Sequence, residues 1–160
     1  MSNANPATTG GKLFTLEKAN AALPLVRAIT ADLVKLSREV VERRERVALL
    51  RGDRDPDSDD PYSEELSQIE EELEKDRLRL QGFVEELRQL GVEPKNGLEG
   101  IVDFPSMMDD RLVYLCWKLG EPEVLFWHEI DAGFAGRQAL AALAAADDAA
   151  DAEGTAPLDA

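Results

Sequence analysis

The sequence has little of several features that would narrow its function. Its 160 residues include one cysteine, Cys116, and one histidine, His128. A single cysteine cannot form an internal disulfide, which suits a reducing cytoplasm, and a single histidine excludes metal motifs built on paired histidines. No apolar run approaches the roughly 18 residues of a membrane span, and the first residues lack the apolar stretch of a secretory signal. We therefore expect a cytoplasmic protein.

Basic residues are also scarce. Lysine and arginine number 18 against 33 acidic residues, which gives a formal net charge of −15. Nucleic acids and anionic membranes are polyanions that bind basic surfaces, so we expect neither as a partner. The segment 53–76 concentrates the acids, and two interpretations stay open. It is either an acidic docking surface for a basic protein partner or a solvated tip that pairs with the more basic residues before it.

Two long helices are predicted in the first part of the chain. Apolar residues recur every three to four positions from residue 16 to Leu50, after Thr15 as a plausible N-cap. Pro24 lies inside this stretch and predicts an irregularity. A second periodic stretch begins near Pro61 and ends at Leu90, where Gly91 is typical of a helix C-cap. Its near-heptad pattern is interrupted by a charged position at Asp76. The two stretches predict an antiparallel helical hairpin.

The period changes after residue 94. The segments "GIVDF", "RLVYLCWKL" and "EVLFWHEI" are short and rich in β-branched and aromatic residues. With "PSMMDD" and "GEP" as connections, they predict a three-stranded antiparallel meander. Alternation in the last strand places Val124, Phe126 and His128 on one face. Leu125, Trp127 and Glu129 are expected on the other.

These elements predict an α+β fold. We expect one domain over residues 12–140, made of a helical hairpin (12–94) followed by the meander and a glycine-rich loop (95–138). Residues 1–11 are expected to be disordered, as is the alanine-rich acidic tail over 141–160. A lone hairpin of this length would expose an apolar stripe, so we also expect self-association, with a homodimer as the simplest case.

The segment "WHEIDAGFAGRQ", residues 127–138, holds the residues best suited to a metal site. Histidine and carboxylates are ligands for divalent ions such as zinc, iron or manganese. The predicted ligands are His128, Glu129 and Asp131, joined by Asp103 from the first strand. The other interpretation is a histidine packed in the sheet, with one ring nitrogen bonded to a carboxylate or a carbonyl.

The same segment suggests an anion site. Arg137 follows two glycines and can fork onto a carboxylate or phosphate, with Arg111 of the neighbouring strand in support. Alternatively, Arg137 bridges to Glu129 or Asp131 within a compact turn.

Cys116 is most simply a small buried hydrophobic residue. A catalytic Cys–His pair would require His128 to lie across the sheet from it.

The stretches "FTLEKANAALPLV", "GVEPKNGLEGIVDFP" and "VYLCWKLGEPEVLFWHEIDAGFAGRQ" together resemble the DUF2203 family, small prokaryotic proteins of unknown function. The resemblance covers about residues 12–140. It implies a helical hairpin with a small sheet and supplies no assigned activity. In "MMDDR", Asp110 occupies a position at which the resemblance implies a glycine. Because the glycine is missing, a tight turn is less expected at this position.

Three functional hypotheses follow. The first is a ligand-binding protein that holds a divalent metal or a small anion at the last strand. The second is a scaffold or adaptor without catalytic activity that self-associates or docks a partner through its hairpin. The third is a small metal-dependent enzyme using the same residues. Whether the protein is an enzyme is left open by the sequence.

Overall fold

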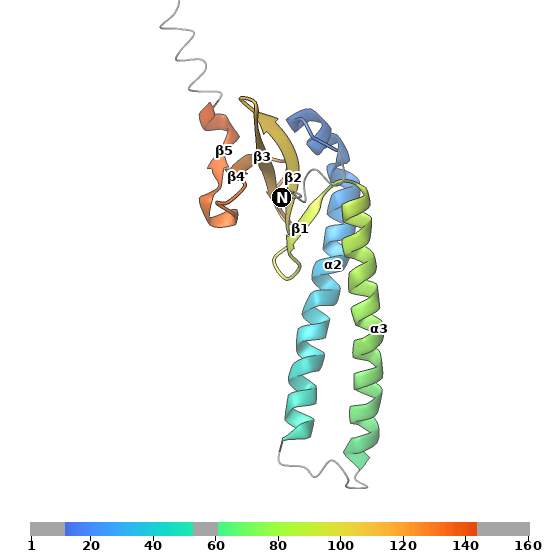
Figure 1. Cartoon of the computed structure of the whole chain (residues 1–160). Coiled ribbons are helices and arrows are strands. Elements are labelled where there is room, and N and C mark those ends of the chain that lie inside the picture. Colours follow the sequence, from blue (N-terminus) through green and yellow to red (C-terminus); the bar gives the residue numbers. More distant parts are fainter. Residues whose placement is uncertain (1–11, 53–60, 144–160) are drawn as a thin grey trace, which may run out of the picture.

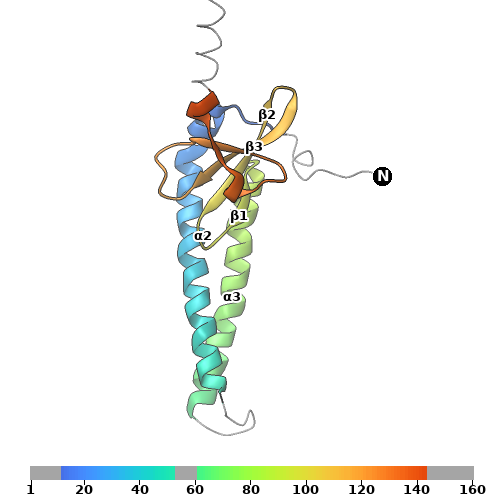
Figure 2. The ribbon, with the colours of Figure 1, turned by 90° about the vertical axis from the view of Figure 1, so that its left-hand side faces the viewer.

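The computed structural model describes residues 12–52 and 61–143. Two long helices, α2 (Leu16–Arg51) and α3 (Pro61–Gln89), lie side by side, and a small sheet packs near the end where α2 begins (Figures 1 and 2). The other end of the pair extends away from the sheet as a two-helix arm. The predicted α+β class, with helices followed by an antiparallel sheet, is confirmed. The predictions for residues 1–11, 53–60 and 144–160 lie outside the described residues.

Helix α2 follows its sequence pattern closely. The Thr15 hydroxyl accepts a hydrogen bond from the Lys18 amide at 3.1 Å, which confirms the predicted N-cap. The helix continues through Pro24 to Arg51, and its 36 residues span about 54 Å. Its buried side chains recur at three- to four-residue intervals, so one face is turned to the core along the whole length.

Helix α3 packs along α2 through the predicted heptad seam. Its charged position, Asp76, is 5% exposed and forms an ion pair with Arg43 of α2. A buried carboxylate without a partner would be costly, so the pair explains how the seam tolerates a charge. The helix ends at Gln89, and Gly91, two residues later, has a φ of +88°. The amide of Gly91 donates to the Arg88 carbonyl and that of Val92 to the Leu87 carbonyl, which confirms the predicted glycine cap.

The sheet has five strands rather than the three predicted. They are β1 (Glu93–Asn96), β2 (Ile101–Met108), β3 (Arg111–Lys118), β4 (Phe126–Glu129) and β5 (Gln138–Ala139), in that spatial order and all antiparallel. The two additional strands lie at the edges. The "EPKN" sequence of β1 is polar and contains a proline, which an edge strand tolerates. The two residues of β5 are too few for a periodic pattern.

The predicted connections also needed correction. Strand β2 continues through Met108, so "PSMMDD" is not a loop, and only Asp109 and Asp110 remain between β2 and β3. Both have a positive φ, +50° and +61°, as the tightest hairpin turns require. The turn is therefore tight although Asp110 replaces the expected glycine. The connection between β3 and β4 is longer than "GEP" and spans residues 119–125.

The two faces of the sheet have different roles. One face packs against the beginning of α2 and forms the core with side chains that include Phe104, Leu115, Trp117 and Trp127. Val124 joins this core, so its predicted place on the face of Phe126 and His128 was wrong. The opposite face carries polar residues, among them Asp103 and His128.

No helix among the described residues is long and apolar enough to cross a membrane.

Candidate functional site: a buried Asp–Cys–His cluster

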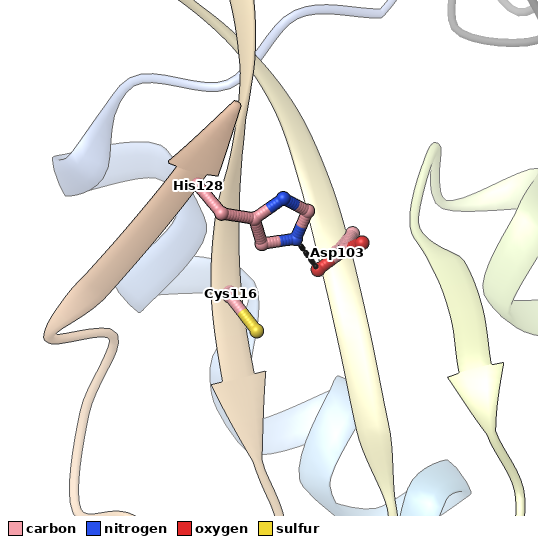
Figure 3. Close-up of side chains that lie close together, drawn as sticks. All are labelled: Asp103, Cys116 and His128. Carbon is pink, nitrogen blue, oxygen red and sulfur yellow. Dashed lines mark hydrogen bonds and ion pairs between the residues drawn. The ribbon is translucent and has the colours of Figure 1, made fainter. Parts of the chain in front are cut away.

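Strand register brings three side chains together on the face of the sheet opposite the core. Asp103 of β2 pairs with Cys116 of β3, and His128 of β4 pairs with Tyr114 of β3. His128 thus lies diagonally from Cys116, and its ring extends across β3 toward Asp103 (Figure 3). Strands β2 and β4 are two strand spacings apart, so this reach depends on the small Cys116 side chain between them.

Hydrogen bonds hold the His128 ring at both nitrogens. Nδ1 lies 2.7 Å from the backbone carbonyl oxygen of Glu129, and Nε2 lies 3.0 Å from Oδ1 of Asp103. The Tyr114 ring flanks the imidazole, with 5.5 Å between ring centroids. His128 and Asp103 are 2% and 1% exposed, so the contact between them is shielded from water.

The partners of the ring determine where its protons lie. A carbonyl oxygen only accepts, so Nδ1 carries a hydrogen and donates it to Glu129. The contact between Nε2 and Asp103 then contains one proton, which makes it either an imidazolium–carboxylate pair or a neutral ring accepting from a protonated acid. In both cases the nitrogen that faces the cluster is Nε2.

Burial shifts the acid–base behaviour of the other two groups. Desolvation raises the pKa of Asp103, and His128 is the strongest influence in the opposite direction. Burial, together with the neighbouring Asp103 carboxylate, raises the pKa of the Cys116 thiol to about 12, although Arg137 opposes the shift. Cys116 is therefore a thiol at neutral pH. A nucleophilic cysteine needs an electropositive setting, so a catalytic Cys–His pair does not fit.

The raised thiol pKa predicts a loss of stability in alkali. Between the ordinary value of 9.0 and about 12, the unfolded chain loses the Cys116 proton while the folded chain keeps it. The free energy of unfolding should therefore fall by about 1.4 kcal/mol for each pH unit above 9. By about pH 10.5 the loss from this group should reach about 2 kcal/mol. Urea unfolding of metal-free protein at about pH 8 and about pH 10.5 measures this loss.

The matched variant for this measurement is Cys116→Ala, which lacks the titrating group. The small cavity left by the substitution lowers the free energy of unfolding by the same amount at both pH values. The comparison therefore uses the change in unfolding free energy between the two pH values. The variant should lose about 2 kcal/mol less than the wild type on the same pH change. Equal alkaline losses in both proteins would contradict a protonated, buried thiol.

The remaining sequence-predicted metal ligands lie elsewhere. The Glu129 carboxylate forms an ion pair with Arg111 at 2.6 Å, and Asp131 is exposed in the turn after β4. Among the described residues, the group whose ligand atoms all lie within 4.8 Å of one another is Asp103, Cys116 and His128. Two of the four predicted ligands, Asp103 and His128, thus lie together, and Cys116, for which the sequence predicts only a packing role, is the third donor.

The two arginines predicted to bind an anion form ion pairs with two different glutamates. Arg111 pairs with Glu129, whereas Arg137 pairs with Glu121 at 2.9 Å, rather than with Glu129 or Asp131. The Arg137 guanidinium also lies over the Phe126 ring, 3.9 Å from its centroid. Each cation already has a carboxylate, so the structure offers little support for a shared anion site.

Cys116 was missed because its neighbours in sequence, Leu115 and Trp117, are both buried in the core. Alternation already placed Cys116 on the opposite face from them. The register that aligns Cys116 with Asp103 depends on the two-residue turn at Asp109 and Asp110. Had that turn been predicted, counting back from it would have paired the two residues.

The fold and the cluster define a class: an α+β protein with a long helical hairpin and a small antiparallel sheet that carries a buried aspartate, cysteine and histidine. Within that class, the chain belongs to the family described as "Uncharacterized conserved protein (DUF2203)", whose family model matches residues 12–140. No curated protein and no solved structure matches this chain.

Proposed function

We propose that this protein binds a divalent transition metal ion, with zinc the best fit, through Asp103, Cys116 and His128. The supporting observation is that a carboxylate oxygen, a sulfur and an imidazole nitrogen from three adjacent strands lie within 4.8 Å of one another. Sulfur and imidazole donors favour zinc and its neighbours over magnesium or calcium, which prefer oxygen. Three protein donors would leave a fourth position for water or another ligand.

The orientation of His128 supports the proposal. Histidine ligands commonly donate their second ring N–H to a carbonyl or a carboxylate, which fixes the tautomer and directs the other nitrogen to the metal. Here Nδ1 donates to the Glu129 carbonyl, and Nε2 faces Asp103. A metal ion would take the place of the proton between Nε2 and Asp103 and of the thiol proton.

The scaffold hypothesis has less support. It predicts an exposed apolar stripe along Leu66–Leu90, but Leu87 is buried and the other apolar residues of that seam are half-buried. Most of these apolar side chains therefore pack between α2 and α3, within the hairpin. Self-association, a basic protein partner and catalysis at the metal remain predictions.

Cobalt binding tests the proposal, since a thiolate ligand gives Co²⁺ a charge-transfer band in the near ultraviolet. The wild type should bind one Co²⁺ with this band, and zinc should displace it. Cys116→Ala should lose the band, and His128→Gln should weaken binding by about tenfold or more. Far-ultraviolet circular dichroism of each variant checks that it is folded.

Asp131→Asn and Glu129→Gln are matched controls, because they remove acidic residues close to His128 in sequence but outside the cluster. Both should bind Co²⁺ as the wild type does. The proposal is overturned if the wild type shows no band, or if Cys116→Ala binds Co²⁺ with unchanged affinity and spectrum.

A further inference from the structure

A metal ion at the cluster would be closed off from solvent. Cys116, Asp103 and His128 are 0%, 1% and 2% exposed. An ion can enter such a site only if part of the surrounding structure opens. The segment with the weakest attachment is the best candidate for that opening, because local opening is easiest where few contacts are broken.

The segment 130–139 contributes Arg137 to the surroundings of Cys116, because the Arg137 guanidinium interacts with the thiol. Phe126 of β4 pairs with Cys116, and the Arg137 guanidinium lies against the Phe126 ring on this face. Phe134, from the short helix η1 (Phe134–Gly136), lies on Arg137 at 4.2 Å from ring centroid to guanidinium carbon. Arg137 is thus stacked with two rings and placed beside the thiol.

This segment is attached by few contacts. Strand β5 pairs with β4 over only two positions, and η1 has three residues. The stronger attachment is the ion pair between Arg137 and Glu121, whose side chains are 15% and 18% exposed. Glu121 is itself held, because its Oε1 accepts the Lys118 amide at 2.7 Å. The Arg137–Glu121 pair therefore ties the segment to the end of β3.

We propose that residues 130–139 form a lid over the cluster and that the Arg137–Glu121 pair is the latch that sets how fast metal enters and leaves. The inference rests on the proposed metal site. Breaking the latch should raise the population of the open state, so uptake and release should both become faster while the affinity changes little.

This outcome differs from a purely electrostatic role for Arg137. Removing a positive charge beside the site would speed the uptake of a cation but slow its release. A faster release is therefore the specific sign of a lid. Arg137→Lys sharpens the comparison, because it keeps the charge but loses the planar fork and most of the stacking.

Stopped-flow measurement of Co²⁺ uptake, and of its release to a chelator, tests the proposal. Arg137→Gln and Glu121→Gln should each raise both rates by about tenfold, the effect of about 1.4 kcal/mol. Arg137→Lys should raise the release rate as well. Arg111→Gln is the matched control, since it breaks another Arg–Glu pair between β3 and β4, and its rates should equal those of the wild type.

A second readout needs no metal. Cys116 is the only thiol, so its reaction with a chromogenic aromatic disulfide reports opening directly. Arg137→Gln should react about tenfold faster than the wild type and Arg111→Gln at the wild-type rate. Faster thiol reaction without Co²⁺ binding would support the lid and overturn the metal site. Co²⁺ binding with unchanged release and thiol reaction rates would overturn the lid alone.

Discussion

Replacing Asp103 by alanine should lower the free energy of unfolding of the metal-free protein by about 3 kcal/mol. The variant would leave Nε2 of His128 without a partner in a site that is 2% exposed. Removing one member of a buried pair costs more than the pair contributes, because the remaining polar group stays desolvated. Urea unfolding in the presence of a chelator, followed by circular dichroism, measures the change.

Asp103→Asn is the conservative control. Because Nδ1 donates to Glu129, a neutral His128 ring presents Nε2 as an acceptor, and the asparagine amide can donate to it. This variant should therefore lose only about 1 kcal/mol. If Asp103→Ala and Asp103→Asn are equally stable, the hydrogen bond between Asp103 and His128 contributes nothing to the fold.

Zinc should stabilise the folded protein by about 4 kcal/mol when its free concentration is about a thousand times its dissociation constant. The cluster joins β2, β3 and β4, so the assembled site exists only in the folded chain. The gain should shrink as the pH falls, because thiol, imidazole and carboxylate must all be deprotonated to bind the ion. Urea unfolding in zinc-buffered solutions at two pH values measures both effects.

The chain has a formal net charge of −15, so zinc can also bind weakly to acidic groups on its surface. The zinc experiment therefore needs a control for this non-specific binding. Asp131→Asn should be stabilised by zinc as much as the wild type, whereas Cys116→Ala should gain little. An equal gain in wild type and Cys116→Ala would place zinc on the acidic surface instead of in the cluster.

The helical part of the fold could be predicted from local signals. The Thr15 cap, the apolar period of α2 and the Gly91 cap are properties of neighbouring residues, and each is present in the structure. The edge strands could not be predicted in the same way. Strand β1 contains a proline and β5 has only two residues, so their pairing depends on the strands beside them.

The candidate site was only half predictable. Composition pointed to the single histidine, and alternation placed Phe126 and His128 on one face. Alternation cannot tell which residue of a neighbouring strand lies opposite, because a shift of register keeps the pattern within each strand and changes every partner. Cys116 was therefore assigned to packing, and Glu129 and Asp131 were favoured for being near His128 in sequence.

The two long helices, the caps at Thr15 and Gly91 and the change to short strands after residue 94 follow from interactions within a few residues of chain, so local sequence predicts them. Three features depend on the folded sheet: Asp103, Cys116 and His128 lie together, Glu129 pairs with Arg111, and Arg137 pairs with Glu121. Each of these contacts joins different strands or loops, and their geometry is set by turn length and register, which act over the whole sheet.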